Sequence, residues 1–181
     1  MTGVQTCALP ISPWVRLQKK GSGYARKLRY ATRQAKDGAA DGLVATVDSD
    51  SLGRSRRLQE LKNGRDQDRQ TAPPFPTAVG EAIPHLEAWL IDDPVATREA
   101  LQLPAQTPVP TVRQTKNPKA ALDELVAQCG RFENVIEALV QIAGRVEPAR
   151  CVHAAETGFK SFADDVRQEL KPLFGEPRRA P

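Results

Sequence analysis

Aromatic residues, cysteines and long apolar runs are all scarce in this chain of 181 residues. Aromatic side chains make up 5% of the sequence, so a core must be built mainly from Leu, Val, Ile and Ala. No apolar run approaches the length of a membrane span, which predicts no membrane partner. The three cysteines show no metal-ligand spacing, and such a sparse, odd number suits a reducing compartment, which favours a cytoplasmic protein.

The charged residues near the start of the chain are almost all basic. Charged residues make up 27% and hydrophobic residues 40%, a balance typical of a globular domain. The net charge of +4 permits nucleic-acid binding without requiring it, and no acid occurs before Asp37. Apolar residues at helical spacing predict an amphipathic helix over 23–36. Arg26, Arg29 and Arg33 on this helix could contact DNA phosphates, or could simply form a solvated helix face.

A short apolar run over 43–47 predicts a strand that is buried on both faces, as in a parallel sheet. Asp48 and Asp50 follow it directly, where the strand would end. Ligands bind at the carboxyl ends of strands in open α/β sheets, and carboxylates are hard oxygen ligands suited to Mg²⁺ or Mn²⁺. The pair could instead cap the following turn through its side-chain oxygens.

A second strand is predicted over 77–83, and Glu87 lies just beyond it. If the two strands are parallel, Glu87 shares a sheet edge with Asp48 and Asp50, where three carboxylates repel one another unless a cation neutralises them. The sequence therefore predicts a metal site formed by Asp48, Asp50 and Glu87. The alternative for Glu87 is a solvated acid in the first turn of a helix, and His85 is expected to be a half-buried, hydrogen-bonded ring.

The other segments predict helices and connectors. Asp93-Pro94 and Asn117-Pro118 are N-cap and N1 pairs that mark helix starts. A polar stretch that ends in Pro-Pro-Phe-Pro predicts a flexible loop over 64–76. The helices that begin at 23, 54 and 94 are expected to pack around the sheet. Helices are predicted over 54–63, 85–91, 94–101, 117–129, 134–146 and 159–173.

The first residues have a separate interpretation. Residues 1–11 resemble the translation of a sequencing-adapter oligonucleotide, so the segment 1–12 is expected to be an artefact that has displaced the true start, with a first strand and its side chains. The alternative is a genuine N-terminus. A signal peptide is disfavoured because the segment has no basic n-region and no proper apolar h-region.

Four short motifs occur in a recognisable order: 47–50 at a strand end, 86–93, 117–119 at a helix start and 160–162 in a late helix. This order resembles the TOPRIM fold, and more closely a family of uncharacterised TOPRIM-like bacterial proteins similar to the nucleases of the overcoming-lysogenization-defect class. The resemblance implies an α/β, Rossmann-like, mainly parallel sheet with helices, followed by an α-helical C-terminal part. The implied division is 1–12 artefact, 13–102 truncated TOPRIM-like core, 103–116 connector, 117–174 helical region and 175–181 flexible tail.

The resemblance also implies a function. It predicts a Mg²⁺- or Mn²⁺-dependent nuclease that hydrolyses DNA, an effector of defence against phages or plasmids, with an ATPase encoded in trans as its partner. Asp48 and Asp50 would hold the metal, Glu87 would complete the site, and Lys119 would neutralise the phosphate, unless Lys119 is simply an exposed first-turn lysine. TOPRIM sites also use a glutamate on the first strand. Its loss predicts that this chain is inactive.

Two other functions remain open at this point. The first is a non-catalytic TOPRIM-like interaction module that partners an ATPase and signals through its helical half. The second is a fragment of a topoisomerase or primase, which is disfavoured because those enzymes need additional domains. A glutamate on an upstream strand would favour the nuclease.

Overall fold

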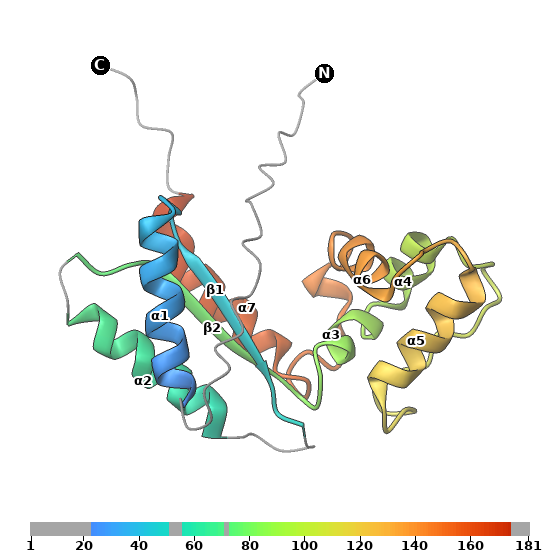
Figure 1. The fold of residues 1–181 in the computed structure, drawn as a ribbon. Coiled ribbons are helices and arrows are strands. Elements are labelled where there is room, and N and C mark those ends of the chain that lie inside the picture. Colours follow the sequence, from blue (N-terminus) through green and yellow to red (C-terminus); the bar gives the residue numbers. More distant parts are fainter. Residues whose placement is uncertain (1–22, 51–55, 71–72, 175–181) are drawn as a thin grey trace.

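The computed structural model describes residues 23–50, 56–70 and 73–174. Figure 1 shows two groups of elements side by side. One is a two-stranded sheet packed with α1, α2 and α7, and the other is a group of helices, α3 to α6. We call α1, β1, α2, β2 and α7 the α/β region, and α3 to α6 the helical region. The elements are α1 (Tyr24–Asp37), β1 (Leu43–Asp48), α2 (Arg56–Arg69), β2 (Thr77–Ala82), α3 (Glu87–Ile91), α4 (Pro94–Leu101), α5 (Pro118–Cys129), α6 (Val135–Ala143), the 3₁₀ turn η1 (Pro148–Arg150), α7 (Phe159–Leu170) and the 3₁₀ turn η2 (Lys171–Leu173).

The strands β1 and β2 form the sheet. They pair in parallel, from Leu43 opposite Thr77 to Asp48 opposite Ala82. This confirms the two predicted strands and the α/β class in coarse form: the described chain is mostly helical, with a small parallel sheet. Parallel pairing places both carboxyl ends at one edge of the sheet.

One face of the sheet is covered by α1 and α2. The backbone N–H of Tyr24 donates to the Glu60 carboxylate of α2 at 2.6 Å, which holds the first turn of α1 against α2. Gly64 allows the two helices to approach closely, because a Cβ there would lie 2.7 Å from the carbonyl oxygen of Ala25. The apolar cluster under these helices is formed by Leu28, Ala45, Leu61 and Val79.

The helix α2 continues to Arg69, so the predicted loop over 64–76 is wrong in its first part. Arg65 is buried and donates to the Asp165 carboxylate of α7 at 2.8 Å. Arg69 forms an ion pair with Glu169 of the same helix. These partners lie 100 residues further along the chain, so the polar sequence of the segment gave no sign of them.

The other face and the outer edge of β2 are covered by α7, and all six residues of β2 are buried. Phe162 packs so closely on Gly80 that a Cβ at this glycine would lie 2.5 Å from the ring. At the edge, the N–H of Val79 donates to the Asp165 carboxylate at 2.7 Å. Because α7 fills this edge, β2 presents no free strand there.

The helical region surrounds a separate apolar core. Each of its three longer helices begins at a side-chain N-cap, with Asp93, Asn117 and Asn134 each accepting a backbone N–H from the first turn. This confirms both predicted N-cap and N1 pairs. The core consists of Leu90, Ile91, Ala100, Leu101, Val109, Leu122, Leu125, Val126, Ala138 and Ile142.

The packing groups the elements differently from the predicted division. The helix α4, expected beside the sheet, packs against α3, α5 and α6, whereas α7, expected with the helical region 117–174, packs on β2. Trp89 of α3 joins the two regions by stacking on Phe162, with ring centroids 4.8 Å apart. The segments 1–12 and 175–181 lie outside the described residues. Among the helices that are described, none has the length and apolarity needed to cross a bilayer.

Candidate metal site

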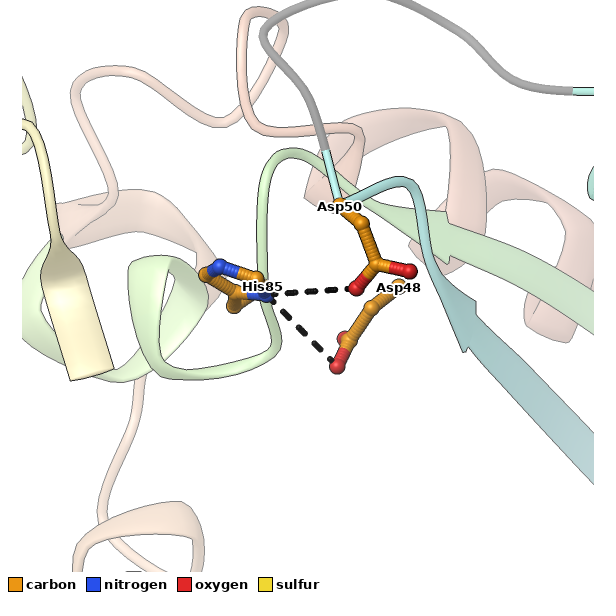
Figure 2. Close-up of side chains that lie close together, drawn as sticks. All are labelled: Asp48, Asp50 and His85. Carbon is orange, nitrogen blue, oxygen red and sulfur yellow. Dashed lines mark ion pairs between the residues drawn. The ribbon is translucent and has the colours of Figure 1, made fainter.

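Three side chains able to bind a metal lie together where the two strands end: Asp48, Asp50 and His85 (Figure 2). Asp48 is the last residue of β1, Asp50 belongs to the segment that follows it, and His85 lies between β2 and α3. One ligand atom from each residue lies within 4.8 Å of the others. The parallel sheet therefore brings together residues that are distant in the sequence.

Backbone hydrogen bonds hold the two segments side by side. The N–H of Ser49 donates to the carbonyl oxygen of Ala82 at 2.9 Å, and the N–H of Asp50 donates to that of Pro84 at 3.1 Å. Asp50 has a positive φ of 56°, a left-handed conformation that aspartate tolerates better than most residues. This turn keeps the Asp50 carboxylate near that of Asp48.

The distances within the group suit a shared cation better than direct hydrogen bonds. Nδ1 of His85 lies 3.8 Å from a carboxylate oxygen of Asp48 and 3.8 Å from one of Asp50, beyond hydrogen-bond range. Metal–ligand bonds of about 2.1 Å place neighbouring ligand atoms roughly 3–4 Å apart. The second Asp48 oxygen accepts the N–H of Leu86 at 2.9 Å. Because Asp48 and His85 are half-buried and Asp50 is exposed, the group is open to solvent.

A positive charge already faces this group. Arg57 of α2 forms an ion pair with Asp50 and donates to the carbonyl oxygen of Asp48. The hydrogen bond that Arg57 donates to the Asp50 carboxylate raises the pKa of Arg57, although partial burial opposes this. On its other side, the guanidinium lies 5.7 Å from the centre of the Tyr24 ring, and the Lys27 ammonium lies 4.8 Å from the same ring. Arg57 therefore contacts both the Asp50 carboxylate and the Tyr24 ring, and Lys27 contacts the same ring.

Glu87 is not a member of the group, although it was predicted as the third carboxylate. The Leu86 N–H is bonded to Asp48, so the residue just before it, His85, lies at the strand end. At Glu87 the chain has already entered the first turn of α3, where the helix dipole favours an acid. The candidate site is thus completed by an imidazole in place of the expected carboxylate.

The other predicted residues lie outside this group. Lys119 is exposed in the first turn of α5, in the helical region, and the described contacts do not connect it with Asp48 or Asp50. Arg26, Arg29 and Arg33 are all exposed on α1. Arg29 donates to the Gln67 side chain at 3.3 Å. These positions are compatible with the predicted DNA contacts without testing them.

Comparison of the chain with family models, curated proteins and solved structures finds no match. The resemblance to TOPRIM-like proteins therefore remains a prediction.

Sequence reasoning missed two residues of this site. His85 carried a partial signal, because it lies two residues after the predicted strand over 77–83, whereas Asp48 and Asp50 lie one and three residues after theirs. The choice of His85 over Glu87 depends on the contact between Leu86 and Asp48 in the folded chain. Arg57 gave no such signal, since its pairing with Asp50 depends on how α2 packs beside the sheet.

Proposed function

We propose that this chain carries the metal site of a TOPRIM-like nuclease that hydrolyses phosphodiester bonds of DNA. The observation that supports this proposal most is the convergence of Asp48, Asp50 and His85 at the carboxyl edge of a parallel sheet. An effector role in defence against phages or plasmids and an ATPase partner in trans belong to the same proposal, through the resemblance in sequence.

The ligand set bears on the choice of metal. Two carboxylates suit Mg²⁺ and Mn²⁺, whereas an imidazole nitrogen is a better ligand for a transition metal than for Mg²⁺. We therefore propose Mn²⁺ as the preferred ion of the Asp48, Asp50 and His85 site, ahead of Mg²⁺. A bound ion of this kind activates a water molecule and stabilises negative charge on the phosphate.

The neighbouring residues have complementary parts in this proposal. Asp48 is fixed by the Leu86 N–H, so one of its oxygens stays directed to the strand edge. Arg57 balances the charge of Asp50 and supplies the positive charge that a phosphodiester needs beside two carboxylates. The roles proposed from sequence for Glu87 and Lys119 have no support from their positions.

Metal binding is the most direct test. Thermal unfolding followed with increasing MnCl₂, with MgCl₂ and with EDTA should show stabilisation by Mn²⁺ at lower concentration, reaching about 2.7 kcal/mol at 100 times the dissociation constant. Asp48→Asn and His85→Ala should each abolish this response. The control is Asp164→Asn, which removes an exposed acid of α7 that pairs with Lys160. An equal response to Mn²⁺ in the wild type and in Asp48→Asn would contradict the site.

Cleavage is tested separately, with labelled DNA and Mn²⁺, in a version of the protein that carries the expected upstream glutamate. Nuclease activity that disappears in Asp48→Asn supports the proposal. Metal binding without any cleavage favours the interaction module instead. That second candidate has an observation of its own, because Ile136 and Val140 lie one turn apart on α6 and are 72% and 53% exposed.

A further inference from the structure

The outward face of α1 carries a regular pattern of side chains. Arg26, Tyr30 and Arg33 recur at positions i, i+4 and i+7, so they lie along one side of the helix over about 10 Å. All three are exposed, and Arg29 is exposed one turn before Arg33. The result is a basic stripe with an aromatic ring between two guanidinium groups.

The charge of this stripe is not balanced within the protein. Across the described residues, Arg26 and Arg33 have no carboxylate within ion-pair distance, and Arg29 contacts the uncharged Gln67. Many other arginines do have an acidic partner: Arg57, Arg65, Arg69, Arg113, Arg150 and Arg167. The positive charge of Arg26 and Arg33 therefore remains available to an anionic ligand.

Tyr30 gives the stripe a second kind of contact. Its side chain is 39% exposed, and its hydroxyl accepts a hydrogen bond from the Gln34 amide at 3.1 Å, which restrains the ring. The rings of Trp89 and Tyr24, by contrast, are occupied by neighbours: Trp89 stacks on Phe162, and Tyr24 lies against Lys27 and Arg57. An exposed ring between cations is the arrangement that proteins use to stack unpaired bases while contacting the flanking phosphates.

We propose that α1 binds single-stranded nucleic acid, with a base stacked on Tyr30 and the neighbouring phosphates held by Arg26 and Arg33. This deepens the proposed function, on which it rests for the class of ligand. A duplex offers phosphates to the arginines but keeps its bases stacked on one another, so it makes no use of Tyr30.

Fluorescence anisotropy of labelled oligothymidylate, measured with the full chain in EDTA at low salt, tests this inference. Tyr30→Ala should weaken binding roughly 5- to 150-fold, whereas Tyr30→Phe, which keeps the ring, should bind as the wild type does. Arg26→Gln and Arg33→Gln should each reduce the slope of log affinity against log salt by about 0.7. Arg131→Gln, at an exposed arginine between α5 and α6, is the matched control and should change neither.

Two results would overturn the inference: equal binding by Tyr30→Ala and the wild type, or a duplex of the same length binding as tightly as the single strand. Circular dichroism of each variant shows whether it is folded, and Tyr30→Phe provides a conservative second variant. Because EDTA removes the metal, the assay fails or succeeds independently of the metal titration. Oligonucleotide binding without metal binding would remove the proposed hydrolase and leave this inference standing, and the reverse outcome would remove this inference alone.

Discussion

The α/β region and the helical region are held together in different ways. The interior of the α/β region contains charged side chains, and Arg65 there contacts both Asp165 and Glu169. These contacts join α2 to α7 across a long stretch of sequence. The core of the helical region is apolar, and its three longer helices are capped by residues next to them in the sequence. The first region depends mainly on distant electrostatic partners, and the second mainly on apolar burial and local capping. Asp93, one of the three caps, also has a distant partner, Arg150.

This difference bears on where function lies. The carboxylates, the imidazole and the Arg57 guanidinium beside them all belong to the α/β region or to the segment that leaves it at His85. A region that already positions charges against one another can hold a charged ligand with little rearrangement. The helical region supplies Trp89, which packs on α7 and fixes the chain just after His85. The helical region therefore contributes to the site by holding the segment around His85 in place.

The largest effect is expected from breaking the buried ion pairs. Arg65→Ala should lower the free energy of unfolding by about 3–5 kcal/mol, because it leaves the Asp165 carboxylate without a counter-charge and leaves Glu169 with Arg69 alone. Urea denaturation measures this loss. Lys160→Ala, which removes an exposed pair with Asp164, is the control and should have little effect. A loss smaller than that for a core leucine would contradict the electrostatic account of this region.

The matching test in the helical region is Leu122→Ala. Leu122 is fully buried in the apolar core, so its truncation should cost about 3 kcal/mol through lost burial and the cavity left behind. Urea denaturation with and without 1 M salt, a concentration at which the Debye length is about 3 Å, separates the two regions. The cost of Leu122→Ala should hardly change with salt, whereas that of Arg65→Ala should change more. Ile136→Ala, at an exposed position of α6, should be nearly neutral.

An intermediate effect is expected at Asp93, which is fully buried and caps α4. Burial would raise the pKa of Asp93, but the backbone N–H groups of Glu147 and Ala96 and the Arg150 guanidinium outweigh it and lower the pKa. A lowered folded pKa means stability that is complete above the unfolded value near 3.9 and is lost as the pH falls through the folded value.

Asp93→Ala should therefore cost about 1–2 kcal/mol at neutral pH, as the loss of an N-cap does. Urea midpoints measured from about pH 7 down to about pH 2 should show that the wild type and the variant converge below about pH 4, as the acid is protonated. A constant difference across this range would mean that the charge of Asp93 contributes nothing.

The smallest effect is expected at Asn134, an exposed residue whose side chain accepts the Glu137 N–H at 2.9 Å. Asn134→Ala should cost about 1 kcal/mol, and Asn134→Asp, which keeps an accepting oxygen, should restore most of it. Helical content followed by circular dichroism during thermal unfolding measures both. A larger cost for Asn134→Ala than for Asp93→Ala would contradict the expectation that an exposed N-cap contributes less to stability than a buried one.

The features that were predicted correctly from the sequence are those that neighbouring residues determine, namely the two strands and two of the helix starts. The strands at 43–48 and 77–82 follow from short apolar runs, and the starts of α4 and α5 follow from an acceptor side chain before a proline. Asp48 and Asp50 were found because they follow a strand directly. The end of α2 and the choice of His85 over Glu87 could not be predicted in this way. Both depend on contacts between segments that only the folded chain brings together.

The position of α7 has a consequence for the order in which the chain can fold. Strand β2 is completed only when Phe162 packs on Gly80 and Asp165 accepts the Val79 N–H, yet α7 is synthesised after both strands and after the whole helical region. During synthesis the helical region can fold through its own local contacts while the edge of β2 is still without α7. An unpaired strand edge is a site of association between chains. Chains interrupted before residue 159 should therefore aggregate even though their helical region is intact.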